Sequence, residues 1–185
     1  MSWIIRLACA QDLSDLYDFY AQIGRKETGY FEACLADQDL GGRIVFLAYA
    51  PHALHQTQNK DVRLAGYVIL NHRPLYALYH KMDIPEIQDL NVAPAYRKQG
   101  LGSALIAHCE DWARSHGKAY IGISVGLTKD YGAAQILYVK RGYVPDGNGV
   151  TYAREPTRHG EIRPIDDDLC LMFLKDLQNN PPHNI

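Results

Sequence analysis

Two basic residues and two glycines lie close together in the segment YRKQGLGSAL, residues 96–105. Arg97 and Lys98 come just before Gly100 and Gly102, and an apolar helical pattern follows. The first N–H groups of a helix have no acceptor within the helix and carry the positive end of its dipole. Glycines allow a ligand to approach the backbone, and basic side chains add positive charge. The segment therefore suits either a phosphate or pyrophosphate site or the plain start of a helix.

Two well-known glycine motifs do not fit this segment. A P-loop requires GxxxxGK[ST], which the sequence lacks. A dinucleotide-binding GxGxxG motif requires a third glycine at the position of Leu105. The glycine turn by itself therefore leaves both interpretations open.

A strand and a helix must position this turn. The segment PEIQDLNV, residues 85–92, predicts a strand whose proline stands at its first position, where no ladder donor is lost. The apolar parity changes between Ile87 and Leu90, which predicts a bulge near Gln88 and Asp89. A helix is predicted over residues 100–116, with one apolar stripe formed by Leu101, Leu105, Cys109 and Trp112.

The remaining chain predicts a mixed sheet with helices, not a regular βαβ winding. Strands are expected at 3–8, 43–50, 62–71, 85–92, 118–124, from 143, and at 169–174, and helices in 12–20, 27–36, 100–116 and 131–141. Residues 72–83 are expected to form a loop or short helix, and residues 145–151 a turn-rich loop. No linker divides the chain, so a single domain over 1–175 is predicted, followed by a disordered tail, 176–185.

Composition excludes several classes of protein. The 19 Lys and Arg residues against 21 Asp and Glu residues give a net charge of −2, which argues against a general nucleic-acid binder. Cys9, Cys34, Cys109 and Cys170 show no CxxC spacing, so buried free thiols are expected, without a metal site or a disulfide framework. No apolar run approaches the roughly 20 residues of a membrane span. The N-terminus becomes polar too soon for a signal peptide, and a cytoplasmic protein is expected.

Four segments in this order resemble the GNAT family of N-acetyltransferases. They are the opening IIRLACAQDL, the strand 85–92, the glycine turn, and the later segment AAQILYVKRGYVPDG. The family pattern [RQ]xxGx[GA] is matched by Arg97, Gly100 and Gly102, and a second signature from Ala133 or Ala134 onward by Leu137, Tyr138, Gly142 and Tyr143. The resemblance runs from about residue 3 to 174. One departure is Tyr131, which stands where many members carry asparagine.

The resemblance implies an α/β fold of the GNAT type. Its central sheet would be mixed, mostly antiparallel and twisted, with about seven strands and about four helices, and splayed at 85–92 to admit CoA. It implies transfer of an acetyl group from acetyl-CoA to the primary amine of a small molecule, by direct attack in a ternary complex. The alternatives are a protein or peptide N-acetyltransferase and a non-catalytic acetyl-CoA sensor on the same fold. A homodimer is a further expectation, since family members often form dimers.

The same resemblance implies which residues contact CoA. Residues 90–92 would pair with the pantetheine arm, and the N–H groups of 98–103 would hold the pyrophosphate. The full expected set is Leu90, Asn91, Val92, Arg97, Lys98, Gln99, Gly100, Leu101, Gly102, Ser103, Ala134 and Tyr138. No metal is expected.

Catalysis asks for a base, an oxyanion donor and an acid. An alkylammonium with a pKa near ~10.4 must lose a proton before it attacks. The resemblance implies Glu86 as the first candidate base, because the family's common base lies at this strand position, and Asp89 is the second candidate. The backbone N–H of Asn91 or Val92 would stabilise the oxyanion. Tyr138 matches the family's tyrosine and would protonate the leaving thiolate. The alternatives are that Glu86 is a solvent-facing carboxylate and that Tyr138 is a core aromatic residue.

The acceptor is the least constrained partner. Tyr30, Tyr76 and Tyr79 are candidates for contacts with it, although Tyr76 and Tyr79 equally suit a loop packed on the core. The acidic run 166–168 could attract a cationic acceptor or could be a solvated loop.

Overall fold

The computed structural model describes residues 3–24, 26–50 and 63–179. The elements are β1 (Ile4–Leu7), η1 (Ala10–Asp12), α1 (Leu13–Tyr20), α2 (Tyr30–Asp39), β2 (Arg43–Tyr49), β3 (Leu64–Asn71), α3 (Ala77–Lys81), β4 (Glu86–Val92), η3 (Pro94–Tyr96), α4 (Leu101–Ser115), β5 (Tyr120–Gly126), η4 (Lys129–Tyr131), α5 (Gly132–Lys140), β6 (Val144–Tyr152), β7 (Glu155–Pro156) and β8 (Leu169–Asp176). In this described part, no helix is long and apolar enough to span a membrane.

The strands follow the order β1-β2-β3-β4-β5-β8-β6-β7 in a mixed sheet. The pairs β1–β2, β2–β3, β5–β8, β6–β8 and β6–β7 are antiparallel, and β4–β5 is parallel. The predicted mixed, mostly antiparallel fold is confirmed. The described residues form eight strands and five α-helices. The strand beyond the expected seven is β7, of two residues, and the helix beyond the expected four is α3, of five residues, within the segment expected to be a loop or short helix. Elements so short leave no periodic pattern in a sequence.

The chain divides into two compact units, residues 1–71 with 88–109 and residues 72–87 with 110–185. The division falls within β4 and α4, which contribute residues to both units. The single domain over 1–175 remains a prediction. The predicted tail starts inside β8, which ends at Asp176, and Leu177 is buried. Residues 180–185 of that tail lie outside the described part.

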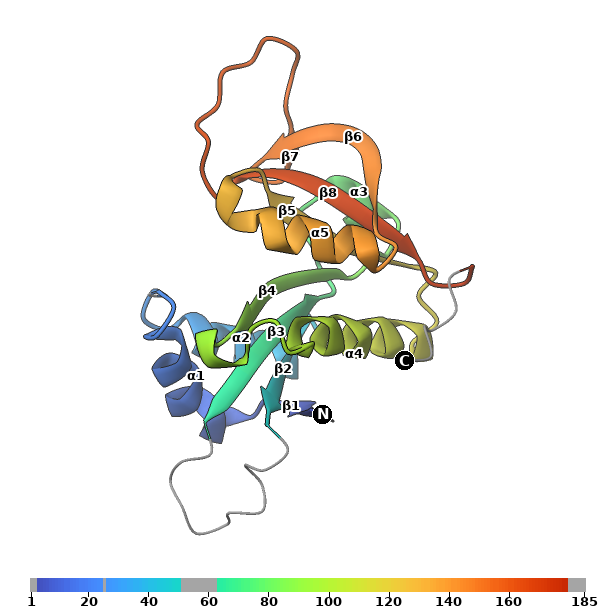
Figure 1. Ribbon diagram of the computed structural model, residues 1–185. Coiled ribbons are helices and arrows are strands. Elements are labelled where there is room, and N and C mark those ends of the chain that lie inside the picture. The colour runs from blue at the N-terminus through green and yellow to red at the C-terminus, as the bar shows by residue number, and fades with distance from the viewer. Residues whose placement is uncertain (1–2, 25, 51–62, 180–185) are drawn as a thin grey trace. The chain divides into compact units, whose positions relative to one another are not determined.

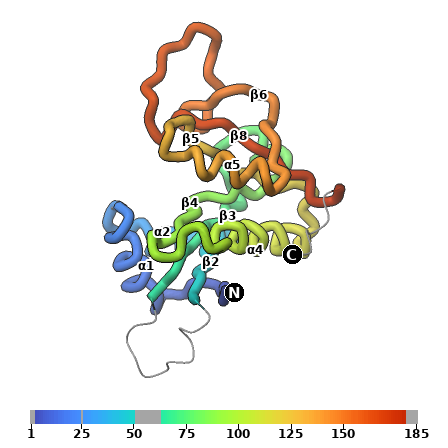
Figure 2. The backbone as a smooth tube through the Cα atoms, viewed as in Figure 1, coloured from blue at the N-terminus to red at the C-terminus, as the bar shows by residue number. Residues whose placement is uncertain are grey.

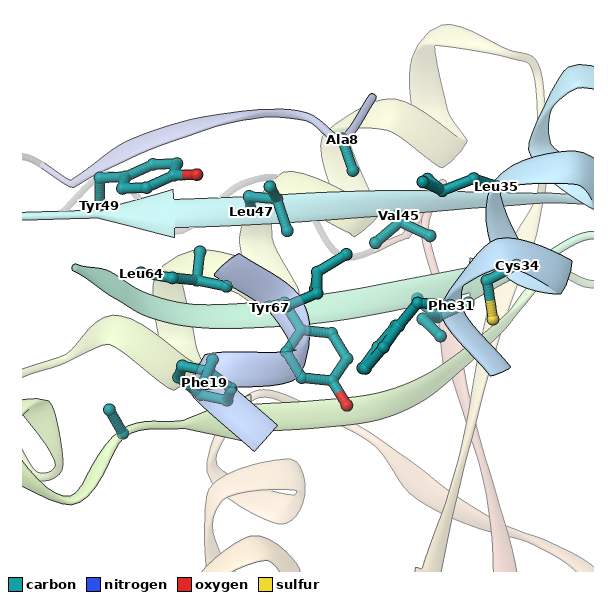
Figure 3. Close-up of a cluster of buried hydrophobic side chains, with 13 residues drawn as sticks. Ala8, Phe19, Phe31, Cys34, Leu35, Val45, Leu47, Tyr49, Leu64 and Tyr67 are labelled. Carbon is teal, nitrogen blue, oxygen red and sulfur yellow. The ribbon is translucent and has the colours of Figure 1, made fainter. Parts of the chain in front are cut away.

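In the first unit, helices cover both faces of β2 and β3. Val45 and Leu47 point to one face, where they meet α1 and α2 in an apolar core, and Figure 3 shows Phe31 and Tyr67 side by side in that core. The intervening Phe46 contacts the ring of His108 on α4. Figure 1 draws β2 and β3 as neighbouring arrows, and Figures 1 and 2 show α4 beside them. Alternate burial of this kind follows from the period of two in a strand.

Gly66 lets β4 and α4 approach β3 closely. A Cβ there would lie 2.7 Å from the carbonyl oxygen of Asn91 and 3.2 Å from Leu101 Cδ2. The predicted stripe of α4 is buried at Leu101, Leu105 and Cys109, whereas Trp112 is half-buried. This tight packing fixes the start of α4 against β4, which positions the glycine turn.

The second unit contains β5, β8, β6 and β7 together with α3 and α5 (Figure 1). The ring of Tyr79 on α3 occupies the space beside Gly122, where a Cβ would lie 2.3 Å from Tyr79 Cε2. The buried carboxylate of Glu110 accepts hydrogen bonds from Lys175 at 2.9 Å and from Arg141 at 2.8 Å. This network ties α4 and the end of α5 to β8.

Two local predictions differ from the structure. Residues 145–151 belong to β6, because the pairing of β6 with β8 resumes after a register shift between Pro145 and Val150. Gly147 and Gly149 in the shifted part have φ of 86° and 79°, so residues typical of turns form an irregularity inside a strand. Cys9 is exposed, unlike the other three cysteines, and its thiol donates to Asp12 at 3.2 Å.

Candidate active site

The glycine turn joins the end of β4 to α4 through the short helix η3. Lys98 has φ of 60° and Gly100 has φ of 85°, both left-handed. That conformation costs a residue with a Cβ about 1 to 2 kcal/mol, so glycine suits position 100. A Cβ on Gly100 would meet nothing within 4 Å, so the backbone there is open to a ligand.

The first turn of α4 presents donors and positive charge to solvent. The bond from Ala104 N–H to the Gly100 carbonyl is of the i to i−4 type at the start of the helix, at 3.0 Å. The N–H groups of residues 101–103 precede it and have no acceptor within a helix of this geometry. Arg97 and Lys98 are exposed, and Arg97 Nε donates to the Val92 carbonyl at 3.1 Å. This set fits a diphosphate such as that of CoA.

Glu86 at the start of β4 is buried, not solvent-facing as one alternative held. Its side chain has 0 % exposure, and Arg154 Nε lies 3.3 Å from its Oε1. Ala153 and Arg154 form the two-residue connection between β6 and β7, with φ of 50° and 70°. Such turns favour glycine or asparagine, so this pair of residues holds a strained backbone. The strained turn places a guanidinium beside a buried carboxylate.

Asp89 lies three residues further along β4, where its φ is 48°. The strand is thus irregular at the position where the apolar parity changes. Lys26 Nζ lies 2.8 Å from Asp89 Oδ2, and the Tyr30 hydroxyl donates to the same oxygen at 2.5 Å. Burial, followed by the charge of Asp89, raises the pKa of Tyr30. The Asp89 side chain keeps 23 % exposure, so this carboxylate is accessible where Glu86 is not.

Aromatic rings surround Asp89 in the first unit. The Phe31 ring centroid lies 5.2 Å from that of Tyr30 and 5.6 Å from that of Tyr67, and Figure 3 shows the Phe31 and Tyr67 rings. Asn91 Nδ2 donates to the Tyr67 hydroxyl at 3.2 Å and to the Asp89 carbonyl at 3.0 Å. Burial raises the pKa of Tyr67. The Asn91 side chain is thus engaged within the protein.

Tyr138 and Ala134 lie on α5 in the second unit. Tyr138 is 6 % exposed, and burial raises the pKa of its hydroxyl to about 12. Its ring centroid is 6.3 Å from that of Tyr143. Tyr131, at the departure from the family pattern, packs its ring against Gly126 and donates to Asp167 at 2.7 Å. Tyr138 is therefore protonated at neutral pH in largely apolar surroundings.

Tyr76 and Tyr79 are core residues of the second unit. They are 2 % and 0 % exposed and pack with Ile84 and Met172. The Tyr76 hydroxyl donates to Asp146 at 2.7 Å, and the Tyr79 hydroxyl to the Phe173 carbonyl at 2.6 Å. Among the described contacts of the three tyrosines expected to contact the acceptor, only the Tyr30 hydroxyl donates a hydrogen bond to a carboxylate of β4, that of Asp89.

The first unit brings together Asp89, Tyr30, Asn91 and the glycine turn, and the second contains Glu86, Ala134 and Tyr138. Sequence reasoning missed Lys26 and Arg154. Lys26 is 63 residues from Asp89, and Arg154 reaches Glu86 only through a strained turn, so neither leaves a local pattern. Among the described residues there is no group of three or more His, Cys, Asp or Glu side chains that could hold a metal ion.

Residues 10–143 match the model of the acetyltransferase (GNAT) family. A search of curated proteins found no match.

Three solved structures among the similar ones share the fold. One is a ribosomal-protein-alanine N-acetyltransferase from Escherichia coli, with 19 % identity, a TM-score of 0.65, and coverage of 100 % of this chain and 99 % of that chain. Another, from Salmonella typhimurium, contains acetyl-CoA as its cofactor, with 17 % identity, a TM-score of 0.64 and full coverage of both chains (100 % and 100 %). The third is a spermidine N-acetyltransferase chimera that includes Vibrio cholerae sequence, with 14 % identity, a TM-score of 0.65, and coverage of 97 % and 98 %.

Proposed function

The chain belongs to the acetyltransferase (GNAT) family, and on that premise we propose that it acetylates the primary amine of a small molecule by direct attack in a ternary complex. Members of this family are N-acetyltransferases that use acetyl-CoA. The observation that carries the proposal is the junction of β4 with α4, where exposed cations and open helical N–H groups fit a diphosphate. Acetyl-CoA, when bound, supplies an acetyl thioester.

The proposed binding residues extend along this junction. The backbone of Leu90, Asn91 and Val92 would receive the pantetheine arm. The parallel pairing of β4 with β5 comprises Glu86 with Gly122 and Ile87 with Ile123, so it does not engage residues 90–92 among the described contacts. Contacts from Gln99, Ala134 and Tyr138 remain part of the proposal.

The protein groups that move protons are assigned as follows. Glu86 would take a proton from the amine nitrogen through water, and Asp89 is the second candidate for this step. The N–H of Asn91 or Val92 would donate to the oxygen on which negative charge develops. Tyr138 holds a proton at neutral pH, since its pKa is raised to about 12, and that proton would pass to the leaving sulfur.

Two other functions on this fold each have a supporting observation. The Escherichia coli relative acts on a ribosomal protein, which favours a protein or peptide acceptor. The complete burial of Glu86 beside Arg154 favours a non-catalytic acetyl-CoA sensor, because an ion-paired buried carboxylate is a poor base. A small amine is supported by Asp89, which is a partly exposed carboxylate bound to an ammonium that lies over an aromatic ring. A cytoplasmic location and a homodimer are retained as parts of the proposal.

Calorimetric titration with acetyl-CoA tests the premise. Lys98→Glu should weaken binding by about 10-fold or more, because it replaces a cation beside the diphosphate with an anion. Lys140→Glu, which reverses an exposed charge at the end of α5, is the matched control and should bind as the wild type does. Equal affinity in both variants would show that the glycine turn is only the start of a helix.

A thiol-release screen then identifies the acceptor class. Polyamines, aminoglycosides, amino acids and peptides would be tested with acetyl-CoA. Release with small amines supports the proposal, and release with peptides alone supports the protein acceptor. Binding of acetyl-CoA with no release for any amine would support the sensor.

A further inference from the structure

The Lys26 ammonium lies in an unusual environment for a lysine outside helices and strands. Its side chain is only 20 % exposed, although lysines normally extend into water. Nζ lies 2.8 Å from one oxygen of Asp89 and 3.1 Å from the other. Both carboxylate oxygens therefore face the same cation.

Two tyrosine rings complete the surroundings of this ammonium. Lys26 Nζ is 4.4 Å from the ring centroid of Tyr30 and 5.1 Å from that of Tyr20. Both distances are within the ~6 Å range in which a ring attracts a cation. The two rings come from the start of α2 and the end of α1, and they pack on Phe31 at 5.2 Å and 6.2 Å. A rigid aromatic cluster thus supports the cation.

Asp89 is held in a conformation that serves this arrangement. Its left-handed φ of 48° costs about 1 to 2 kcal/mol, and such strain persists where the surroundings impose it, often at binding sites. The Tyr30 hydroxyl donates to the Asp89 carboxylate, and the Asn91 amide donates to the Asp89 backbone carbonyl, so the side chain and the backbone of Asp89 are each held by a hydrogen bond. A carboxylate, two ring faces and a fixing hydroxyl are the components with which proteins recognise ammonium groups.

Lys26 itself is loosely attached to the fold. It belongs to the connection between α1 and α2, outside any helix or strand. A partly exposed ion pair contributes about 1 kcal/mol or less. Withdrawal of this side chain therefore breaks one ion pair and two cation–π contacts, and it removes no residue from a helix or strand of the first unit.

We propose that Asp89, Tyr20 and Tyr30 form the site for the ammonium of a small aliphatic amine, and that Lys26 is an internal occupant that the amine displaces. This inference rests on the proposed function, in which such an amine is the acetyl acceptor. It gives Asp89 the role of an anchor for the cation. It also gives the connection between α1 and α2 an autoinhibitory role, because the amine must compete with a tethered lysine.

Calorimetric titration with n-butylammonium chloride tests this site without catalysis, because the probe copies a lysine side chain. Lys26→Met should bind the probe roughly 10-fold more tightly than the wild type, the factor expected if Lys26 fills the site about nine-tenths of the time. Lys129→Met, which removes an exposed lysine from η4, is the matched control and should bind as the wild type does. Asp89→Asn, added to Lys26→Met, should abolish the gain. Neutral n-butanol should not bind to any variant.

The outcomes separate this inference from the proposed function, because acetyl-CoA is titrated in parallel. Unchanged affinity for the probe in Lys26→Met, with a lower melting temperature, would show that Lys26 only fixes the connection, and the inference would fall. Tight binding that survives Asp89→Asn would overturn it as well. Probe binding without acetyl-CoA binding would leave the ammonium site standing and remove the proposed function. Acetyl-CoA binding, with no increase in probe affinity in Lys26→Met, would retain the proposed function and overturn the ammonium site.

Discussion

Glu86 and Asp89 are two carboxylates three residues apart on β4, each paired with a cation, and their surroundings differ in almost every other respect. Glu86 belongs to the second unit, is fully buried, and faces a guanidinium held by a strained turn. Asp89 belongs to the first unit, keeps 23 % exposure, and faces an ammonium between two aromatic rings. Removing one partner of a buried ion pair is costly because the other charge stays buried. A partly exposed ion pair contributes little to stability, so one cation can replace another there.

The difference in burial suits Glu86 and Asp89 to different roles. A buried carboxylate cannot lose its partner without leaving an uncompensated charge. An accessible one can exchange one cation for another. Glu86 therefore suits a fixed role in catalysis or in holding the fold, and Asp89 suits reversible recognition of an amine.

The largest expected effect is on catalysis by Glu86→Gln. If Glu86 removes the proton from the amine, kcat/KM should fall by about 10² to 10⁴, with acetyl-CoA affinity nearly unchanged. Glu155→Gln, at an exposed position of β7, is the control and should keep wild-type rates. Steady-state kinetics across pH measure the effect. If Glu86→Gln kept the wild-type kcat/KM, Glu86 would not be the base, and Asp89 would be the next candidate.

The next effect is on stability and comes from the guanidinium beside Glu86. Arg154→Ala should lower the free energy of unfolding by about 3 kcal/mol, because it leaves a buried carboxylate without that cation. Arg163→Ala removes a half-exposed arginine that pairs with Glu161 and should cost no more than about 0.5 kcal/mol. Urea titration of both variants measures the difference. Equal losses would show that the burial of Glu86 does not distinguish the two sites.

A third carboxylate, Asp12, extends the comparison to pH. Arg6 donates to it at 2.6 Å and lowers the pKa of Asp12 from 3.8 to about 2. Because the folded-state pKa is depressed, the stabilisation is complete above pH 4 and is lost as the pH falls toward 2. The loss should be about 1 to 2 kcal/mol, since the half-exposed Arg6 is screened by solvent.

Acid unfolding of Asp12→Asn tests this expectation. The variant should be less stable at neutral pH, and its stability should depend less on pH between 4 and 2. A wild-type acid transition in Asp12→Asn would mean that other carboxylates control unfolding at low pH.

The smallest effect is expected from Lys26→Ala. Its pair with Asp89 is partly exposed, so unfolding should become easier by only about 0.5 to 1 kcal/mol. The same urea titration as for Arg154→Ala makes the two values directly comparable. A loss as large as that of Arg154→Ala would contradict the exchangeable character of the Asp89 site.

Patterns of residues close together in the chain predicted the fold class, the glycine turn and the apolar stripe of α4. The change of parity at Ile87 and Leu90 even located the irregularity of β4 at Asp89. Short elements such as β7 escaped because two residues carry no periodicity. Residues 145–151 of β6 were predicted to form a loop because their glycines permit either structure.

The groups that face the two carboxylates of β4 could not be predicted from local sequence patterns and are known only from the folded structure. Lys26 approaches Asp89 across 63 positions of sequence, and Arg154 reaches Glu86 through a turn whose residues do not favour its backbone. Tyr76 and Tyr79 are likewise buried in the core, a role that the sequence left open beside contacts with the acceptor. Charge pairing and burial depend on the approach of distant segments, and no local pattern of residue types records that approach.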